Sequence, residues 1–371
     1  MIISYAFLVY LMCVLLNNIC VNSRYSILIP NDNMGQKKYH GRLFAFFSLI
    51  FLAIIGLRGD TVGIDTWNYA HIYRTFASIN DWKGLISYSA INNYYEIGYN
   101  ILLFAFSKIG LEIWQVRLIF ACIACVPVFM LIHQKSRSYV LSLFLYLAFG
   151  EYVFAFSGMR QGAAIGLVVM AYLGVMKGNR LKAIIWILLA TTIHSSAFIA
   201  LLILFISKIR VSKKTIILFL GVSGIILGFQ GVIFNLLRSY AARTYDDIQV
   251  GGTMFSLFLI FTTVINLYIF TQYTRDMSED EREMQAFLFW NNALTAMVYL
   301  FARLSPVYLR LTLYYQILMI ISVPNMLSII KEKVVRICAT AAYICIGLFY
   351  YYTYVLYSYD IVPYVFFWEV V

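Results

Sequence analysis

The stretch Leu43–Phe76, "LFAFFSLIFLAIIGLRGDTVGIDTWNYAHIYRTF", joins an apolar run to a strongly polar segment and decides the fold class. Its first part, residues 43–57, contains one polar side chain, Ser48. We expect this run to cross a bilayer as a helix, because a helix satisfies its own backbone hydrogen bonds in lipid. The next residues are polar and charged, among them Arg58, Asp60, Asp65, His71 and Arg74. The chain is therefore expected to leave the membrane here and to carry chemistry where it emerges.

The composition of the whole chain extends this interpretation. Of its 371 residues, 62% are hydrophobic and only 12% are charged, whereas soluble domains have roughly 25% charged residues. A β-barrel would show weak alternation instead of long apolar runs. The sequence predicts an all-α polytopic membrane protein with about 10–12 transmembrane helices. Beside the N-terminal run and 43–57, the expected spans are 114–132, 139–156, 159–176, 215–237, 253–273, 287–302, 311–329 and 337–357.

The distribution of basic residues predicts the topology. The N-terminal run "MIISYAFLVYLMCVLL" has no basic residue before it, and Arg24, Lys37, Lys38 and Arg42 follow it. A secretory signal would have a basic start, so we expect an uncleaved first helix with its N-terminus outside. The run 43–57 then returns to the outer face. Residues 58–96 become an outer loop, periplasmic or extracellular, and loops of this length in compact proteins are usually functional.

Two apolar runs do not fit a simple alternation of sides. The run 97–109 is short for a crossing, and 183–207 has basic residues at both ends. If every basic cluster lies inside, both runs are re-entrant or broken helices; alternatively each crosses, and some basic loops lie outside. No internal repeat or soluble domain is apparent, so 1–371 is expected to form one membrane domain. The basic clusters are His133–Arg137, Lys177–Lys182, Lys208–Lys214, Arg275–Arg282 and Lys331–Arg336.

Three arginines are candidates for binding an anion. Arg160 and Gln161 open "MRQGAAIGLVVMAY", in which small residues permit close helix packing. A guanidinium at a helix start suits an anion, although an interfacial arginine can also be a simple anchor. Arg303 and Arg310 flank a short turn, and two guanidiniums suit a multi-oxygen anion such as a phosphate. Their alternative is again positive-charge anchoring.

Two carboxylates and one histidine are candidates for proton transfer. Asp65 or Glu96 is expected to act as a general base for a hydroxyl if suitably placed. Each has a simpler reading as a solvated loop residue or an ion-pair partner, and Asp65 precedes Thr66 and is equally a candidate helix cap. His194, in "TTIHSSAF", interrupts an apolar run. Such a histidine is either a packed, hydrogen-bonded residue or a catalytic one.

Several function classes are excluded or disfavoured. The net charge of +11 resides mainly in short loops between apolar runs, which is typical of membrane topology and not of nucleic-acid binding. Cys122 and Cys125 form a C-x-x-C on an expected membrane helix without a second ligand pair, so no metal is expected. No zincin spacing, nucleophile elbow or P-loop occurs. We expect no cofactor.

Taken in order, the singled-out residues resemble a known family. The motifs are R-x-x-x-x-G-x-D-T-x-x-Y (Arg58, Gly63, Asp65, Thr66, Tyr69), E-x-G-Y (Glu96, Gly98, Tyr99), R-Q (Arg160, Gln161), H-S-S-A (His194–Ala197) and R-L-x-x-Y-Y (Arg310, Leu311, Tyr314, Tyr315). The set resembles the EpsG family of exopolysaccharide polymerases, relatives of the Wzy-type O-antigen polymerases. Each motif is weak alone; their order on a polytopic background carries the resemblance, which runs over nearly the whole chain.

The resemblance implies a GT-C-like glycosyltransferase membrane domain. Its implied reaction joins undecaprenyl-pyrophosphate-linked oligosaccharide repeat units into exopolysaccharide, capsule or O-antigen at the outer face of the bacterial inner or plasma membrane. A chain-length regulator of the Wzz type and a flippase are implied partners. The expected catalytic residues are Asp65, Glu96 and His194. The residues expected to bind pyrophosphate or sugar are Arg58, Arg160, Gln161, Arg303, Arg310, Tyr69 and Tyr314.

Three rival functions stay open at this point. A ligase that transfers a finished glycan uses the same donor chemistry but typically has one much larger outer loop. A transporter or flippase of the lipid-linked repeat would show paired repeats and broken helices. A membrane O-acyltransferase would also explain His194, but it would handle its acyl donor from inside, whereas the charged residues here are expected outside.

Overall fold

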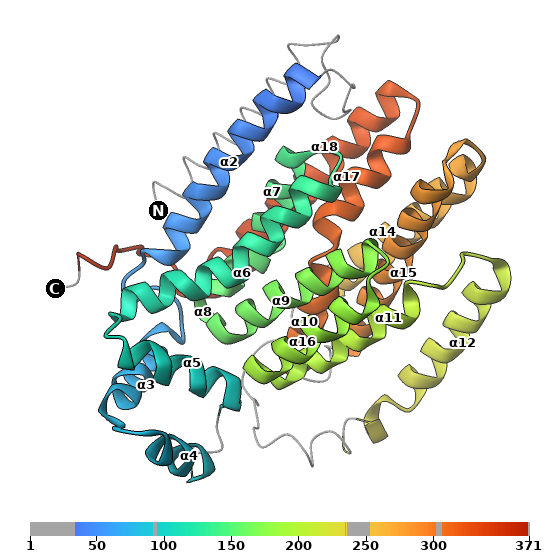
Figure 1. The fold of residues 1–371 in the computed structure, drawn as a ribbon. Coiled ribbons are helices and arrows are strands. Elements are labelled where there is room, and N and C mark those ends of the chain that lie inside the picture. Colours follow the sequence, from blue (N-terminus) through green and yellow to red (C-terminus); the bar gives the residue numbers. More distant parts are fainter. Residues whose placement is uncertain (1–33, 92–94, 234, 236–252, 302–305, 370–371) are drawn as a thin grey trace.

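The computed structural model describes residues 34–91, 95–233, 235, 253–301 and 306–369, and within them it is a bundle of helices without a strand (Figure 1). The all-α class predicted from the sequence is confirmed. The first half comprises α2 (Met34–Gly56), α3 (Thr66–Ser78), α4 (Trp82–Ile91), α5 (Ile97–Lys108), α6 (Ile113–Lys135), α7 (Tyr139–Ala148), α8 (Glu151–Ser157) and α9 (Met159–Met176).

The second half begins with α10 and ends in a π-helical turn. Its elements are α10 (Arg180–Ile193), η1 (Ser195–Leu201), α11 (Leu202–Ile206), α12 (Lys213–Gly228), α14 (Thr253–Tyr273), η2 (Thr274–Asp276), α15 (Glu279–Phe301), α16 (Pro306–Gln316), α17 (Met319–Ile329), α18 (Lys333–Tyr350) and η4 (Tyr351–Val355).

The described residues include four helices that are long and apolar enough to cross a membrane, or six when each of two bent pairs counts as one span. These confirm a polytopic membrane protein. The number is below the expected 10–12 partly because some expected spans are shorter helices in the described residues, such as Phe44–Gly56 and α12 with 16 residues. The expected N-terminal helix lies outside the described residues. The four long spans are Ile113–Lys135, Met159–Met176, Met254–Asp276 and Lys333–Val355.

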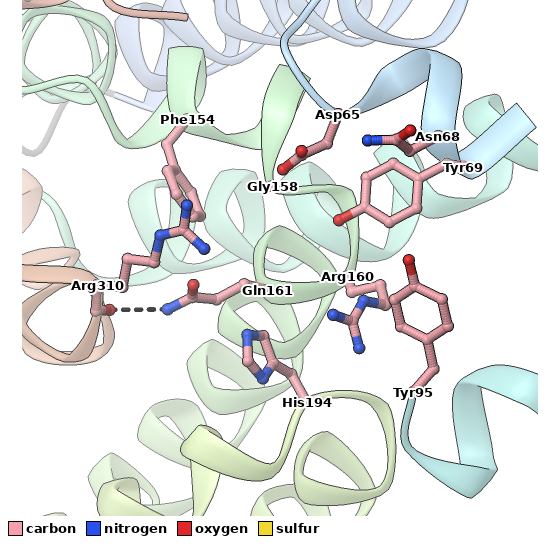
Figure 2. A pocket seen from close by; sticks show the side chains of 10 residues that line it. All are labelled: Asp65, Asn68, Tyr69, Tyr95, Phe154, Gly158, Arg160, Gln161, His194 and Arg310. Carbon is pink, nitrogen blue, oxygen red and sulfur yellow. Dashed lines mark hydrogen bonds between the residues drawn. The ribbon is translucent and has the colours of Figure 1, made fainter. Parts of the chain in front are cut away.

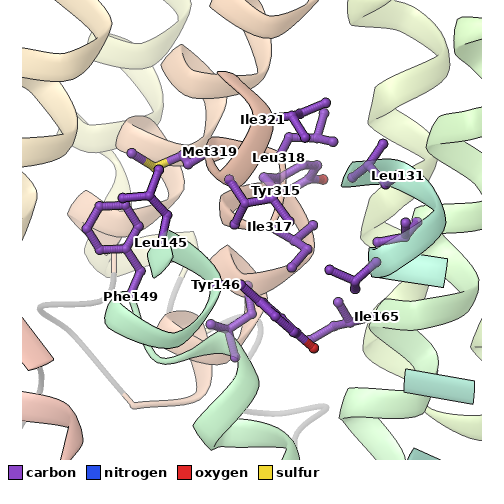
Figure 3. Packing of buried hydrophobic residues seen from close by; sticks show 14 of the residues in the cluster. Leu131, Leu145, Tyr146, Phe149, Ile165, Tyr315, Ile317, Leu318, Met319 and Ile321 are labelled. Carbon is purple, nitrogen blue, oxygen red and sulfur yellow. The ribbon is translucent and has the colours of Figure 1, made fainter. Parts of the chain in front are cut away.

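Two runs that the sequence predicted as single spans, 139–156 and 311–329, are broken. Each break bends the helix axis by 47°. The first break lies at Gly150, which follows α7 and precedes α8. Its φ is +87°, a value that residues with an L side chain rarely adopt. The two breaks meet, because the side-chain amide of Gln316 donates to the Phe149 carbonyl at 3.3 Å. Figure 3 shows the buried side chains around them, including Phe149, Ile317 and Leu318.

The run 183–207 is broken, which is one of the two alternatives that its flanking basic residues left open. Helix α10 ends at Ile193, His194 is extended, and η1 starts at Ser195. Helix α5 is short, as expected, because 12 residues rise only about 18 Å. The hydrocarbon core of a bilayer is about 30 Å thick. Both exceptions therefore supply helix ends, next to Glu96 and His194, that a continuous span would not have at these positions.

Helix α9 lies at the centre of the bundle, between α6 and α10 (Figure 1). Its small residues make this possible. A Cβ on Gly166 would lie 2.0 Å from the Ile123 carbonyl oxygen, so α9 and α6 approach closely. A Cβ on Gly162 would lie 3.1 Å from Ala155 Cβ of α8. Small residues allow such close approach of helices in membranes. Arg160, at the start of α9, is carried into the interior.

The described part of the segment 58–96 contains two short helices, α3 and α4, instead of an open loop. One face of α3 is buried, with Thr66, Tyr69, Ala70, Tyr73 and Phe76 at helical spacing. This face belongs to a second apolar cluster that also includes side chains of α5, α6 and α9. The segment predicted to lie outside the membrane is thus packed firmly against the bundle, and the start of α3 has a fixed position.

Candidate active site

Ten residues from six separate segments line one cavity of about 190 Å³ (Figure 2). The segments are the start of α3, the residue before Glu96, the end of α8, the start of α9, the break after α10, and α16. Its volume holds several waters or a phosphate-sized group. The lining residues are Asp65, Asn68, Tyr69, Tyr95, Phe154, Gly158, Arg160, Gln161, His194 and Arg310.

Arg160 is held in place on two sides. Its guanidinium lies over the ring of Tyr95, 4.2 Å from the ring centre, and 5.4 Å from that of Tyr99. Its Nη1 donates to Glu96 Oε2 at 2.5 Å. The side chain is only 9% exposed, and a buried guanidinium needs such partners. Arg160 therefore presents a fixed positive charge to the cavity.

Glu96 does not line the cavity but lies directly behind Arg160 and His194. Its Oε1 accepts hydrogen bonds from the backbone N–H and the hydroxyl of Ser195, at 2.8 and 2.9 Å. His194 Nδ1 lies 3.4 Å from the same oxygen. Burial alone would raise the pKa of Glu96, but the bonds from His194 and Ser195 and the charge of Arg160 outweigh it and lower the pKa to about 2. Glu96 is therefore an ionised group at the start of α5 that contacts both α9 and the break at His194.

Asp65 is the carboxylate that faces the cavity (Figure 2). It occupies the N-cap position of α3, as its sequence context suggested, but its side chain makes no capping hydrogen bond. Within the part of the chain that the structure describes, its carboxylate has no hydrogen bond or ion pair. An aspartate at this position usually caps its helix. Here the carboxylate is left available to a bound molecule.

The carbonyl of Phe156 fixes the backbone that displays Asp65. Phe156 lies at the end of α8, where helix carbonyls lack partners within the helix. Arg58 Nη2 donates to this oxygen at 2.9 Å and Thr66 Oγ1 at 3.2 Å. Gly63, with φ +102°, passes so close that a Cβ would lie 2.7 Å from the same oxygen. Arg58, Gly63 and Thr66 of the R-x-x-x-x-G-x-D-T motif thus surround one carbonyl oxygen. Asp65 lies in the chain between Gly63 and Thr66, so its backbone position is fixed by the same contacts.

The C-terminal segment holds the same backbone from the other side. Gly59 N donates to the Val365 carbonyl at 2.9 Å, and Phe367 N donates to Leu57 at 3.0 Å. Gly63 N donates to the Asp360 carbonyl at 2.9 Å. These bonds satisfy backbone groups in a stretch without regular structure. The position of Asp65 is therefore determined by parts of the chain about 300 residues apart.

The opposite wall of the cavity joins α9, α16 and the His194 break. Gln161 Nε2 donates to the Arg310 carbonyl at 2.7 Å (Figure 2). Ser196 Oγ lies 3.5 Å from His194 Nδ1 and 2.9 Å from the Tyr314 hydroxyl. Gln161 Oε1 is buried and has no hydrogen-bond partner among the described residues. This wall thus offers Gln161, His194 and the side chain of Arg310 to a ligand.

The sequence-derived candidates divide into three groups. Arg58 and Tyr314 lie outside the cavity lining, Glu96 stands one contact behind it, and Arg303 lies outside the described residues. The cavity also contains four residues that the sequence did not single out. These four are Asn68, Tyr95, Phe154 and Gly158. Each lies close in sequence to a motif residue, and this closeness was the signal that the sequence offered. The candidates that line the cavity are Asp65, Tyr69, Arg160, Gln161, His194 and Arg310.

The charges of the cavity favour an anionic ligand close to a group that gains or loses a proton. Arg160 and Arg310 are the cations of its lining and Asp65 is the carboxylate. Arginine binds phosphate oxygens in a bidentate manner. No group of three His, Cys, Asp or Glu side chains that could hold a metal ion occurs in the described ranges.

The fold and the cavity define a polytopic helical membrane protein whose buried arginine site suits a phosphate-bearing substrate. The chain belongs to the EpsG family, whose model matches residues 41–366. Membership implies a Wzy-like polysaccharide polymerase, and hence a glycosyltransferase activity in a membrane. Neither the curated proteins nor the solved structures compared with the chain contain a match.

Proposed function

We propose that this protein polymerises oligosaccharide repeat units carried on undecaprenyl pyrophosphate, for an exopolysaccharide, a capsule or an O-antigen. The observation that carries the proposal is the cavity itself. It combines two arginines with one carboxylate, Asp65, that has no described protein partner. These are the groups needed when a hydroxyl displaces a pyrophosphate.

In the proposed reaction a sugar hydroxyl of one lipid-linked glycan attacks the anomeric carbon of another. The bond between that carbon and the pyrophosphate oxygen breaks, and the electron pair leaves with the pyrophosphate. Arg160 and Arg310 offset the charge that develops on the leaving group. Tyr69 and Tyr95 line the same cavity and supply aromatic faces for the sugar. The apolar surfaces of the bundle accommodate the polyprenyl chain.

The same proposal places the cavity at the outer face of the inner or plasma membrane. The predicted topology supports this placement, because Asp65 and Glu96 belong to the segment 58–96 that follows an expected inside-to-outside crossing. The lipid-linked repeats would then arrive from a flippase, and a Wzz-like regulator would limit the chain length.

The test compares the glycans of cells that carry wild type, a deletion, Arg160→Ala or Arg74→Ala at equal protein level. Arg74 is the matched control, since it is exposed, lies outside the cavity and pairs with Asp60 at 3.2 Å; such surface pairs contribute little. We expect single repeat units with the deletion and with Arg160→Ala, some still delivered to the surface acceptor, and full polymer with Arg74→Ala.

Two other outcomes would replace the proposal. Full-length polymer that stays on the lipid carrier in the deletion strain would indicate a ligase. Single units that accumulate only on the cytoplasmic side would indicate a transporter. The transporter is the second candidate because two spans are broken and meet at Phe149 and Gln316, and broken helices are typical of secondary transporters.

A further inference from the structure

The two carboxylates at the cavity are held in opposite ways. Each oxygen of Glu96 has a donor: Arg160 Nη1 at Oε2, and the two Ser195 groups at Oε1. The carboxylate of Asp65 faces the cavity with no described partner. A proton acceptor in catalysis needs a free lone pair within reach of the substrate. Of these two carboxylates only Asp65 meets that condition, because Glu96 does not line the cavity and its oxygens already accept from Arg160 and Ser195.

From this contrast we propose that Glu96 is a positioning residue that stays ionised, and that Asp65 accepts the proton of the attacking sugar hydroxyl. The proposal rests on the polymerase function and deepens it. In the step, the O–H bond of the acceptor breaks and its proton moves to an Asp65 oxygen. The hydroxyl oxygen bonds to the anomeric carbon, and the pyrophosphate leaves with the electron pair. Asp65 then releases the proton to water.

The surroundings of Glu96 explain what it positions. It joins Arg160, which binds the donor pyrophosphate in the proposed function, to His194 and Ser195 across the break after α10. Its pKa of about 2 agrees with a group that remains charged throughout. Without Glu96, the guanidinium of Arg160 would be a largely buried cation with no carboxylate partner, beside the rings of Tyr95 and Tyr99 and the side chain of Tyr69, an unfavourable state.

His194 is a less suitable proton acceptor than Asp65. Burial disfavours the charged imidazolium of His194. Its Nδ1 also already lies 3.4 Å from Glu96 Oε1 and 3.5 Å from Ser196 Oγ, whereas the Asp65 carboxylate faces the cavity with no described partner. The groups that face Asp65 across the cavity are Tyr69 of α3, Tyr95, Arg160 of α9, His194 and Arg310 of α16. Those that act on Glu96 are Arg160, His194, Ser195, Tyr99 and Tyr314.

The experiment measures extension of lipid-linked repeats by the purified full-length protein across the acidic pH range, with donor KM and kcat separated. We expect Asp65→Asn to lower kcat by about 10²–10⁴-fold and to remove the fall of kcat at low pH. We expect Glu96→Gln to keep that fall and to raise the donor KM. Loss of the acidic fall in Glu96→Gln, or its survival in Asp65→Asn, overturns the assignment.

Ser195→Ala separates positioning from base catalysis without changing a charge. Ser195 does not line the cavity, and the substitution removes one of the donors to Glu96. If Glu96 positions Arg160, the donor KM rises by about three- to tenfold and the acidic fall stays at the same pH. If Glu96 is the base, its weaker hydrogen bonding moves the acidic fall to higher pH and leaves the KM unchanged. Equal unfolding midpoints of Ser195→Ala and wild type confirm that folding is intact.

The failure of this assignment is distinct from failure of the polymerase proposal. If purified wild type does not extend lipid-linked repeats at any pH, the proposed function is wrong and the assignment falls with it. If wild type extends them and the variants behave as a Glu96 base requires, the function stands and only the assignment is overturned.

Discussion

A close backbone contact beside the site makes a sharp prediction for Gly63→Ala. Gly63 has φ +102°, a conformation that costs a residue with a Cβ about 1–3 kcal/mol. The added Cβ would lie 2.7 Å from the Phe156 carbonyl oxygen, whereas ordinary contact begins at 3.4 Å. The loop must therefore move by about 0.7 Å, and Asp65, two residues further on, moves with it.

The expected effect on catalysis is larger than the effect on stability. A displacement of about 1 Å at a reacting group can lower a rate by about 10²-fold. We expect kcat of Gly63→Ala to fall by about 10–100-fold and the free energy of unfolding to fall by about 2–3 kcal/mol. The assays are extension of lipid-linked repeats and thermal unfolding of the same detergent-purified sample.

Gly110→Ala is the matched control. Gly110 also has a positive φ, +75°, but a Cβ there would meet no atom within 4 Å. It therefore isolates backbone strain, and we expect a loss of about 1 kcal/mol of stability with unchanged kcat. The reasoning is refuted if Gly63→Ala and Gly110→Ala are alike in both assays. It is refuted equally if Gly63→Ala is less stable than the control but fully active.

Three further predictions concern packing, a buried arginine and pH. Gly166→Ala should leave little folded protein, because its Cβ would lie 2.0 Å from the Ile123 carbonyl oxygen. The control Gly221→Ala on α12, where a Cβ meets open space, should leave the yield and the unfolding temperature nearly unchanged. Equal yields of the two variants would contradict the close packing of α6 and α9. Arg58→Lys should lose about 1–3 kcal/mol of stability, because one ammonium cannot replace the guanidinium that bonds both the Ile55 and the Phe156 carbonyls; a wild-type unfolding temperature would argue against this. The lowered pKa of Glu96 stabilises the folded state above its ordinary value of 4.5, and this contribution disappears as the pH falls toward 2. Wild type should therefore lose more stability than Glu96→Gln over that range in unfolding curves, and parallel losses would show that Glu96 is not held as described.

The fold class was predictable from the sequence, but the breaks in its helices were mostly not. Low charge content and long apolar runs require membrane helices whatever their packing. Gly150, Glu151 and Gln316 interrupt the otherwise apolar runs 139–156 and 311–329, but isolated residues of this kind also occur in continuous spans, so they did not predict a bend. The position of the break depends on what packs there, such as Val355 against Gly150. By contrast, a break in 183–207 was one of two alternatives that the sequence offered, because basic residues stand at both ends of this run, and the structure places the break at His194.

The site was predictable where charge stands out and not where it depends on tertiary contact. Asp65 and Arg160 are conspicuous in an apolar chain, and both line the cavity. Tyr95 was not singled out although it directly precedes Glu96, because it is one of 30 tyrosines and nothing else distinguishes it in the sequence. Arg58 and Asp65 belong to one short motif and were expected to act together on substrate. Only the contact with Phe156, 98 positions from Arg58, shows that Arg58 holds the backbone while Asp65 faces the cavity.

The charged groups of the site lie mainly at helix ends, and this location solves a problem that membranes pose. Asp65 and Glu96 precede the first residues of α3 and α5, Arg160 is the second residue of α9, and His194 follows α10. A charge in the middle of a continuous span must find a polar partner in an apolar region. At a helix end, backbone N–H and C=O groups already need such partners, as when Ser195 N bonds Glu96. Short and broken helices therefore allow this bundle to bring two arginines, two carboxylates and a histidine together at one cavity, where the charge of a bound anion would be compensated.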